Sequence, residues 1–417
     1  MAVPRTRTAP EHRPSLAIIG SRGYPSYYGG FETAVRWLAP YLVDNGWDVT
    51  VYGRAGATRD DDPRRDYRVA RRVTPGLETK SLSTLSYGFT STLDVARRKP
   101  DVALVMNVAN GFWLPFLRAR GIPTLVNVDG IEWDRAKWGR VAKAVFLRGA
   151  TVTARFASRL VFDAEAIADR WRMDFGCEGD FIPYGGIPQP DLPIEPGLAH
   201  REYVLVVARF VPENSIPEFL EACGRIAAHH DVVIVGSSGY GGELDERVAA
   251  LAESNDRVRW LGHISDDLRL FSLWQHAGVY FHGHSVGGTN PALVQAMALG
   301  APVVARDTIY NREVLGDCGA VTGAEPSQIE EAVNALMSDK SRQARYSRMA
   351  LARASSSYSW NEVCMRYEQS LSRLISAPTR GPQIARDSKS RSLAGPLLNS
   401  TLSDLGQRKR LPETGPA

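Results

Sequence analysis

Short apolar runs alternate with amphipathic stretches along most of the chain. The segment 102–106, for example, contains only Val, Ala, Leu and Met, whereas Val35, Leu38 and Leu42 recur at helical spacing. Strands that are apolar throughout and alternate with helices form parallel sheets covered on both faces, so the pattern predicts an α/β fold. The predicted strands lie at 16–20, 48–52, 102–106, 124–128, 203–207, 232–236, 258–261, 279–281 and 302–304.

The alternation is interrupted once. A Pro- and Gly-rich stretch at 183–197 predicts a linker between a first α/β domain at 15–190 and a second at 196–357. At the ends, 1–14 is an Arg- and Pro-bearing tail, and 377–417 is rich in Ser, Pro, Gly and charge. Neither end has the apolar residues needed for a core, so both are predicted to be disordered.

A glycine-rich turn follows the predicted strand 279–281 and precedes a helical pattern. Backbone N–H groups at such a turn, together with the positive end of the helix dipole, bind phosphate oxygens. An ordinary turn whose glycines only allow close packing is the alternative. The candidate diphosphate ligands in this turn are Gly287, Gly288, Thr289 and Asn290.

A second Gly-Gly pair occupies the corresponding place in the first half. Gly29 and Gly30 come after the run 16–20 and before an amphipathic helix. Ligands of α/β sheets bind outside the carboxyl ends of the strands, so two such edges facing each other would form a cleft. The spacing Gly-x-Gly-x-x-Gly is absent, which argues against a dinucleotide-binding domain.

Several blocks, in this order, resemble the family-4-type glycosyltransferases with the GT-B fold, and more narrowly their bacterial rhamnosyltransferase-like branch. The resemblance extends from about residue 16 to 375. It implies two Rossmann-like doubly wound parallel-sheet domains facing across a cleft, with a last helix at about 358–376 crossing back onto the first domain. The blocks are Ser21-Arg22-Gly23, Tyr28 to Thr33, Asp129 to Trp133, Arg209 to Asn214, Gly288 to Pro291 and Asn311-Arg312-Glu313.

The resemblance also implies the chemistry, in which a nucleoside diphosphate leaves the anomeric carbon of a donor sugar. Negative charge develops on the leaving phosphate, where cations and N–H donors stabilise it most. Arg209 directly follows a predicted strand and can meet two phosphate oxygens at once. Many relatives carry a lysine five residues later, where this chain has Asn214, so Arg22 or Arg312 are further candidate cations. A surface ion pair is the alternative role of Arg209.

The resemblance implies two glutamates, eight positions apart, that contact the donor sugar and the ribose. This chain has Gly287 and Gln295 there. A neutral amide binds vicinal hydroxyls less tightly than a carboxylate does. A deoxyribose presents only one of these hydroxyls, so the substitution favours dTDP-rhamnose over a UDP- or GDP-hexose. Reduced activity and a helix-surface glutamine without a ligand are the alternatives.

The acceptor is expected to contact the first domain. Asp129 and Glu132 follow the predicted strand 124–128, which places both carboxylates at the edge of the cleft, where either could orient or deprotonate an acceptor hydroxyl. Capping of a helix near residue 131 is the alternative role of Asp129. By resemblance the reaction retains the anomeric configuration, with help from the leaving phosphate. The acceptor would be a glycan or a polyprenyl-diphosphate-linked saccharide.

Basic residues are interleaved with apolar ones between 133 and 159. This combination suits a helix on an anionic membrane, although a helix with its apolar side in the core and solvated basic residues fits equally well. The set is Arg135, Lys137, Trp138, Arg140, Val141, Lys143, Val145, Phe146, Leu147, Arg148, Arg155 and Arg159.

Composition narrows the function classes. A net charge of +4 argues against a nucleic-acid partner, and the four cysteines have neither zinc-site nor disulfide-framework spacing. Acidic residues at 60–62 stand among arginines, which favours a solvated loop over a metal site, and no metal or cofactor is expected.

No apolar run is long enough to span a membrane, so we expect a cytoplasmic protein. It would be peripheral at the inner face of the plasma membrane if the basic helix binds lipid. The LPETG motif at 411–415 is followed by only two residues, which favours chance or a tag over a sorting signal.

A glycosyltransferase that builds cell-surface polysaccharide or glycoconjugate is therefore the leading hypothesis. A catalytically weakened scaffold or regulator with the same fold remains open because of Asn214 and Gln295. A GT-B-like sugar-nucleotide epimerase, which needs no separate acceptor, is the third alternative.

Overall fold

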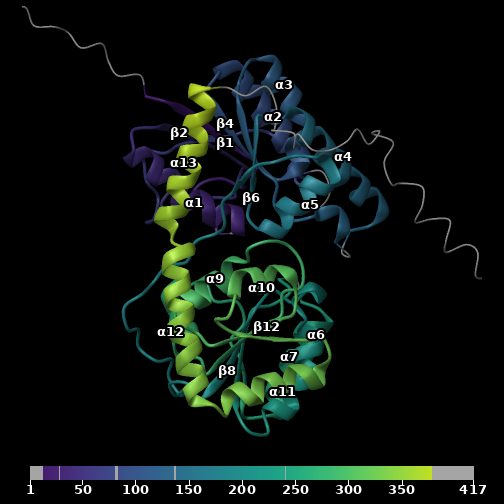
Figure 1. Ribbon diagram of the computed structural model, residues 1–417, viewed down its shortest axis with the longest axis vertical. Coiled ribbons are helices and arrows are strands. Elements are labelled where there is room, and N and C mark those ends of the chain that lie inside the picture. Colours follow the sequence, from purple (N-terminus) through teal and green to yellow (C-terminus); the bar gives the residue numbers. More distant parts are fainter. Residues whose placement is uncertain (1–12, 28, 80–82, 136–137, 240, 378–417) are drawn as a thin grey trace, which may run out of the picture.

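The computed structural model describes residues 13–27, 29–79, 83–135, 138–239 and 241–377. It contains two parallel sheets, each covered by helices on both faces (Figure 1). The tails predicted at 1–14 and 377–417 lie outside the described residues except for Arg13, Pro14 and Ala377. The carbonyl of Pro14 accepts a hydrogen bond from the N–H of Asp48 at 2.9 Å, so the described part of the N-terminal segment already runs beside the first sheet.

The first sheet has the strand order β3-β2-β1-β4-β5-β6-β7, and every pair is parallel. Its strands are β1 (Ser15–Ile19), β2 (Asp48–Gly53), β3 (Ala70–Val73), β4 (Val102–Met106), β5 (Thr124–Asn127), β6 (Arg159–Phe162) and β7 (Asp180–Phe181). Its helices are α1 (Gly30–Asp44), α2 (Ser83–Arg98), α3 (Leu114–Ala119), α4 (Arg140–Phe156) and α5 (Glu165–Phe175), with short 3₁₀ turns η1 (Val108–Trp113) and η2 (Glu132–Asp134).

The second sheet has the order β10-β9-β8-β11-β12-β13 and is also fully parallel. Its strands are β8 (Tyr203–Val207), β9 (Asp231–Val235), β10 (Val258–Trp260), β11 (Val279–His282), β12 (Val303–Arg306) and β13 (Ala320–Thr322). The helices of this half are η3 (Pro212–Asn214), α6 (Ile216–Ile226), α7 (Glu243–Ser254), α8 (Asp267–His276), α9 (Pro291–Ala298), α10 (Ile309–Leu315), α11 (Pro326–Met337) and α12 (Lys340–Ser357).

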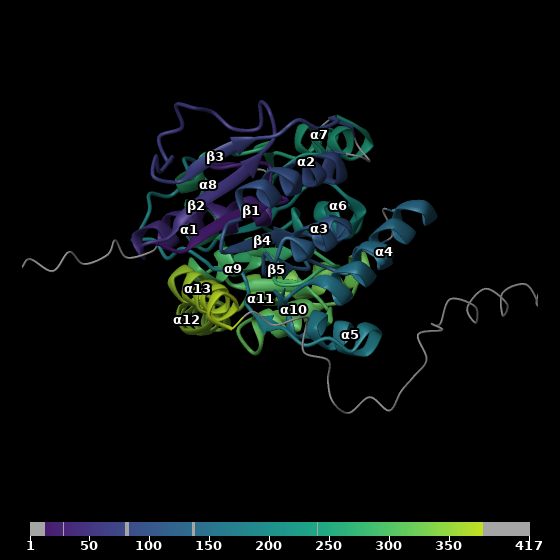
Figure 2. The same cartoon turned by 90° about the horizontal axis from the view of Figure 1, so that it is seen from above.

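Both sheets have the doubly wound order, with a reversal of strand order between β1 and β4 and between β8 and β11. The predicted α/β fold with two Rossmann-like parallel sheets is therefore confirmed. Ligands of such sheets bind where the order reverses, outside the carboxyl ends of the strands. The two halves meet in the middle of the molecule, where α9 and α10 of the second half lie next to the first half (Figure 1), and the two halves overlap in the view from above (Figure 2).

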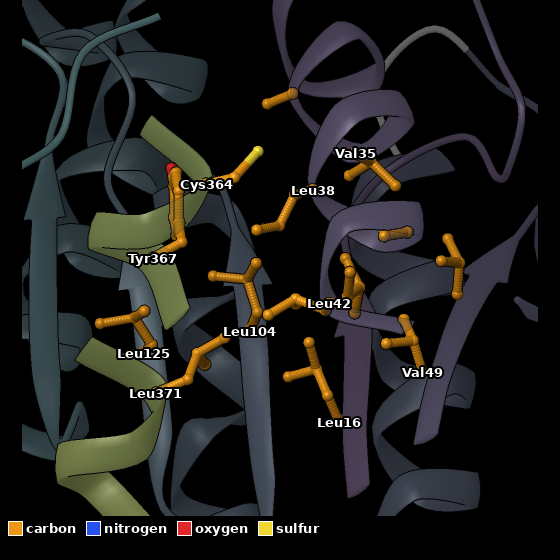
Figure 3. Close-up of a cluster of buried hydrophobic side chains, with 14 of the residues drawn as sticks. Leu16, Val35, Leu38, Leu42, Val49, Leu104, Leu125, Cys364, Tyr367 and Leu371 are labelled. Carbon is orange, nitrogen blue, oxygen red and sulfur yellow. The ribbon is translucent and has the colours of Figure 1, made fainter. Parts of the chain in front are cut away.

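The last helix, α13 (Trp360–Ser376), leaves the second half and packs on the first (Figure 1). Tyr367 and Leu371 lie in the same buried cluster as Leu38 of α1 and Leu104 of β4 (Figure 3). The carboxylate of Glu368 accepts hydrogen bonds from Tyr41 and Trp47, both at 3.1 Å. The helix therefore completes one face of the first sheet, although it lies nearly two hundred residues beyond that sheet's last strand.

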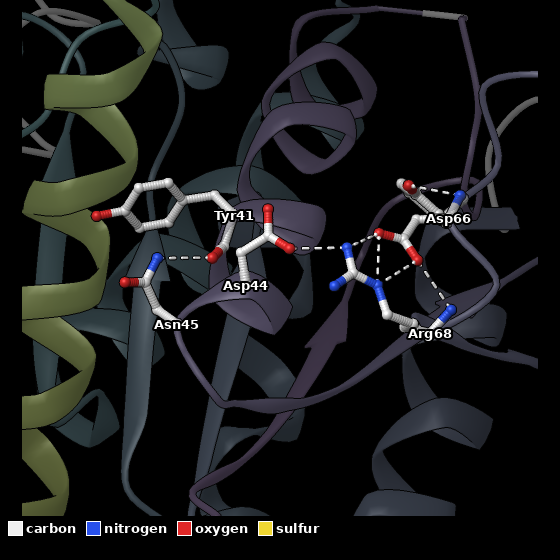
Figure 4. Close-up of polar contacts among 6 residues, drawn as sticks. Tyr41, Asp44, Asn45, Asp66 and Arg68 are labelled. Atoms are coloured by element: carbon white, nitrogen blue, oxygen red, sulfur yellow. Dashed lines mark hydrogen bonds and ion pairs between the residues drawn. The ribbon is translucent and has the colours of Figure 1, made fainter.

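A small polar network fixes the far end of α1 (Figure 4). The guanidinium of Arg68, in the loop before β3, lies 2.7 Å from the carboxylate of Asp44 and 2.6 Å from that of Asp66. The side-chain amide of Asn45 donates to the carbonyl of Tyr41 at 2.8 Å and so closes the last turn of the helix. Since α1 is held at this end, its N-terminal glycines keep a defined place at the opposite, cleft-facing end.

Candidate active site

The glycine-rich turn of the second half lies against the first half. A Cβ atom added to Gly288 would stand 2.1 Å from Oδ1 of Asp163, and one added to Gly130 would stand 3.2 Å from Cα of Gly287. The hydroxyl of Thr289 donates to the main-chain carbonyl of Asp163. Glycine at 288 is therefore required for this close approach of the two domains.

The same turn leads into α9 as the sequence predicted. The side chain of Asn290 caps the helix by accepting the N–H of Ala292 at 2.9 Å, and Pro291 is its first residue. Within the described residues, no hydrogen bond is made to the N–H groups of Gly287, Gly288 and Thr289. These N–H groups and the positive end of the α9 dipole can therefore bind an anion.

Asp163 directly follows β6 and is buried at the contact between the domains. Burial, reinforced by the negative charge of Asp129, raises the pKa of Asp163 well above its usual range. Its Oδ1 atom has no hydrogen-bond partner among the described residues. A carboxyl group with a raised pKa takes on its negative charge less readily, so it opposes a negatively charged ligand at the neighbouring turn less than an exposed carboxylate would.

Arg209 and Asn214 stand beside the turn at the end of β8. Arg209 is exposed, and its guanidinium makes no ion pair within the described part of the chain. The amide of Asn214 donates to the carbonyl of Arg209 at 2.8 Å, while its oxygen accepts from Nδ1 of His284 at 2.7 Å. Asn214 thus connects two segments: the loop that carries Arg209, and the end of β11, where the glycine-rich turn begins. A lysine could not form this bridge, because its side chain has no acceptor.

The two acceptor-side candidates differ in their surroundings. Asp129 follows β5 with a left-handed φ of +62°, and Nδ2 of Asn107 lies 3.4 Å from its carboxylate. The N-cap of η2 is Ile131, which makes no capping bond through its side chain, so Asp129 stands two residues before the N-cap position. Glu132 is buried, and its two oxygens lie 2.6 Å from Arg135 and from the indole nitrogen of Trp138. Glu132 is therefore held within its own loop, and a substrate role for either carboxylate remains a prediction.

The remaining predicted ligands take less direct positions. Gly29 is the N-cap of α1 and Gly30 its first residue, next to the hydroxyl of Tyr184. Arg312 lies on α10, and its exposed guanidinium pairs with Asp307. The structure brings the loop of Asp129 against Gly287 and joins the loop of Arg209 to the glycine-rich turn through Asn214. Arg312 pairs with Asp307 in its own loop. Their roles in binding remain predictions.

A cavity of about 470 Å³ opens between the two domains beside α9, within the size range of small-molecule sites. Trp37 and Trp360 stack at 5.8 Å on its first-domain side, and Phe271 and Trp274 line it from the second domain. This cavity could not be recognised in the sequence, because most of its lining comes from α1, α8, α9, the linker and α13, which are far apart along the chain.

Gln295 lines the cavity and is buried rather than exposed on a helix surface. Its Oε1 accepts the N–H of Ile187 at 3.0 Å, and its Nε2 donates to the carbonyl of Ile187 at 2.8 Å. The amide therefore holds the linker against α9. One lone pair and one N–H remain for a ligand.

We predict that Gln295→Glu destabilises the protein by about 1–3 kcal/mol, because a carboxylate cannot donate to the partly buried carbonyl of Ile187 and leaves it unpaired. Urea unfolding followed by fluorescence measures the change. Gln275→Glu is the matched control, since Gln275 makes the same two kinds of bond to the linker at Leu192 and Pro190 but is only partly buried. Equal stabilities of the two variants would contradict the role assigned to Gln295.

The two halves match two family models in succession. Residues 29–185 match the "Glycosyl transferase 4-like domain" model, and residues 201–339 match the "Glycosyl transferases group 1" model. The chain has the two domains of a GT-B glycosyltransferase. The resemblance seen in the sequence blocks is thereby confirmed at the level of the family-4 type, without distinguishing the rhamnosyltransferase-like branch.

Two curated relatives match part of this glycosyltransferase. It is 28% identical over 163 residues to the O-antigen chain mannosyltransferase B of Escherichia coli, covering 37% of this chain and 41% of the relative. It is 31% identical over 213 residues to the phosphatidyl-myo-inositol mannosyltransferase of Mycolicibacterium smegmatis, covering 47% and 53%. The matches thus span about half the length of these relatives.

Solved structures show the same fold. Sucrose-phosphate synthase from Thermosynechococcus elongatus superposes with a TM-score of 0.73 at 18% identity, over 88% of this chain and all of the other. HepE from Anabaena in complex with UDP-glucose superposes with a TM-score of 0.68, also at 18% identity, over 87% of this chain and all of HepE. At these identities the likeness concerns the architecture of the glycosyltransferase alone.

Proposed function

We propose that this protein transfers a hexosyl or deoxyhexosyl group from a nucleotide-sugar donor to a saccharide acceptor in the synthesis of cell-surface polysaccharide or glycoconjugate. One observation carries the proposal: the glycine-rich turn at the start of α9 meets Asp163 and the loop of Asp129 across the domains, and Asn214 joins the loop of Arg209 to this turn. This arrangement offers N–H donors and a cation to a leaving diphosphate, and a carboxylate to an acceptor. The two mannosyltransferase relatives support the same type of reaction.

In this mechanism the diphosphate lies over the N–H groups of Gly288 and Thr289, and Arg209 neutralises the charge that develops as the bond to the anomeric carbon breaks. Asp129 orients the acceptor hydroxyl from the opposite domain. The acceptor oxygen forms its bond to the anomeric carbon on the face from which the diphosphate leaves, so the configuration is retained, and the acceptor proton passes to the leaving phosphate. Glu132, held by Arg135 and Trp138, shapes this loop rather than reacting.

The nucleoside of the donor occupies the cavity of about 470 Å³ beside Gln295. Because Ile187 takes half of the bonding capacity of this amide, a ribose with two hydroxyls gains little over a deoxyribose. This favours dTDP-rhamnose as the donor, in line with a rhamnosyltransferase-like branch. The names of the relatives, both mannosyltransferases, make a nucleotide-linked mannose, tested as GDP-mannose, the main competitor, and HepE, solved with UDP-glucose, adds that sugar nucleotide to the comparison.

The acceptor is a glycan or polyprenyl-diphosphate-linked saccharide at the inner face of the plasma membrane. On α4, Phe146 and Leu147 pack against the core, whereas Val141 is 80% exposed on a face with Arg140 and Arg148. Lys137 lies outside the described residues. An exposed apolar residue among arginines suits peripheral binding to anionic lipid. Among the described residues, no helix is long and apolar enough to cross a membrane.

Co-sedimentation with anionic liposomes tests the membrane contact. Binding that weakens with salt is expected, and Val141→Glu should reduce it. Equal recovery with anionic and neutral vesicles would contradict a membrane role for α4.

The function is tested by incubating the protein with dTDP-rhamnose, GDP-mannose and UDP-glucose, and measuring thermal shift and nucleoside diphosphate release. A true donor stabilises the folded state by RT ln(1 + [L]/Kd), about 2.7 kcal/mol at one hundred times Kd. Release of nucleoside diphosphate that rises with a lipid-linked saccharide extract supports transfer. Binding without release would indicate a scaffold or regulator, and isomerisation of the sugar nucleotide without acceptor would indicate an epimerase.

A further inference from the structure

Tyr184 lies where the chain crosses from the first domain to the second, directly before the glycines of the linker. On the side of the second domain, a Cβ atom added to Gly186 would stand 2.9 Å from the carbonyl oxygen of Val294 in α9. On the side of the first domain, a Cβ atom added to Gly30 would stand 3.1 Å from the hydroxyl oxygen of Tyr184. The hydroxyl therefore lies at the N-terminus of α1, close to the crossing between the domains.

The hydroxyl of Tyr184 has no partner within the described part of the chain, although the side chain is only 6% exposed. Other buried tyrosines of the protein are paired. The hydroxyl of Tyr203 donates to the carbonyl of Leu273 at 2.6 Å, and that of Tyr367 accepts from the amide of Asn127 at 2.7 Å. Buried polar groups normally find a hydrogen-bond partner, so an unpaired one beside a candidate site is a candidate ligand contact.

The charges around this hydroxyl favour a neutral ligand. Burial, followed by the negative charges of Asp129 and Asp163, raises the pKa of Tyr184 well above its usual range, and Glu32 has a smaller effect in the same direction. The phenol therefore keeps its proton at neutral pH and can donate it in a hydrogen bond. Three acidic side chains nearby disfavour a diphosphate at this point, whereas a sugar oxygen carries no charge.

The same two aspartates connect Tyr184 with the glycine-rich turn. Asp163 meets Gly288, and the loop of Asp129 meets Gly287. In the proposed mechanism the diphosphate lies on this turn and the acceptor lies beside Asp129. The sugar that is transferred must then lie between the turn and Asp129, in the region where the hydroxyl of Tyr184 has its main charged neighbours.

We propose that the hydroxyl of Tyr184 donates a hydrogen bond to an oxygen of the transferred sugar and so positions its anomeric carbon between the diphosphate and the acceptor. This inference rests on the proposed function, because it assigns a contact to the donor sugar of that site. The linker thereby contributes a sugar-binding residue at the point where the two domains meet.

The variant Tyr184→Phe tests this contact, because it removes the hydroxyl and keeps the ring. Isothermal titration of the full chain compares dTDP-rhamnose, GDP-mannose and UDP-glucose with dTDP, GDP and UDP. The affinity for the nucleotide sugar that binds the parental protein should fall about three- to tenfold, the size expected for one neutral hydrogen bond. The affinity for the corresponding diphosphate, which has no sugar, should stay within about twofold. An equal loss for both ligands would place the hydroxyl at the phosphates and overturn the proposal.

Tyr367→Phe is the matched control, since Tyr367 is a buried tyrosine of the same apolar cluster. Its loss leaves the amide of Asn127 without this partner, so the midpoint of urea unfolding should fall while the nucleotide-sugar affinity stays parental. Tyr184→Phe should show the opposite pattern, with parental stability and a lower affinity, because no protein partner is lost. Reduced stability with parental affinity in Tyr184→Phe would assign the residue a structural role and overturn the proposal.

Turnover provides a further readout. The kcat/KM for nucleoside diphosphate release should fall in Tyr184→Phe by the same factor as the affinity or by more, because a poorly positioned anomeric carbon reacts more slowly. A nucleotide sugar that binds and reacts equally well in both proteins would overturn only this inference. If none of the nucleotide sugars or diphosphates binds the parental protein, the proposed function itself is contradicted.

Discussion

Replacing Arg209 with alanine is expected to lower turnover by about 10²–10³-fold, because one preorganised group at a developing charge typically supplies that much stabilisation. The fold should remain intact, since Arg209 is exposed and its guanidinium makes no ion pair in the described part of the chain. The rate of nucleoside diphosphate release, measured with the donor that the panel identifies, gives the effect. Circular dichroism and thermal unfolding establish that the variant is folded.

Arg225→Ala is the matched control for this substitution. Arg225 is an exposed arginine of the same domain, but it lies near the end of α6 and pairs with Glu330 on α11, away from the turn. Its removal should leave turnover within a factor of about two, because exposed ion pairs contribute little. Parental turnover in Arg209→Ala would exclude this arginine from the mechanism.

Gly288→Ala is expected to reduce turnover on the order of 10²-fold. The added methyl group would meet the buried carboxyl group of Asp163 at 2.1 Å, so the turn or Asp163 has to move. Displacement of reacting groups by about 1 Å can cost that much in rate. Steady-state kinetics measures the loss, and small-angle X-ray scattering reports whether the domains separate.

A second substitution distinguishes a steric effect from a lost ligand. Asp163→Ala removes the obstructing carboxyl group. Gly288→Ala should therefore lower turnover less in the Asp163→Ala background than in the parental protein. Gly224→Ala is the control, since no atom lies within 4 Å of a Cβ atom at that helical glycine. No recovery in the double variant, with normal folding, would show that contact with Asp163 is not the reason that position 288 requires glycine.

The fold could be predicted because its central strands are apolar throughout. All nine strands named from the pattern are present, with ends that shift by a residue or two. Four further strands, β3, β6, β7 and β13, were not predicted. The edge strands β3, β7 and β13 are only two to four residues long, and β3 carries two arginines, so they lack the continuous apolar run that a buried strand shows.

Because β6 was not predicted, one residue of the candidate site was also missed. Asp163 stands at its carboxyl end, the place from which Asp129 and Arg209 were selected, and recognising the short run Arg159–Phe162 would have drawn attention to it. The pairing of Glu132 with Arg135 and Trp138, and the bond of Gln295 to the linker, could not be predicted. They depend on side-chain directions and on contacts between segments far apart in sequence.

The position of α13 has a consequence for synthesis on the ribosome. Leu38, Leu104 and Leu125 of the first domain are covered by Tyr367 and Leu371, which are translated only after the whole second domain (Figure 3). Until then the nascent first domain has one open apolar face, so its final consolidation has to follow release of the C-terminal helix from the exit tunnel. During that interval the face is a binding surface for chaperones, and a message truncated before residue 360 yields a chain that cannot cover it.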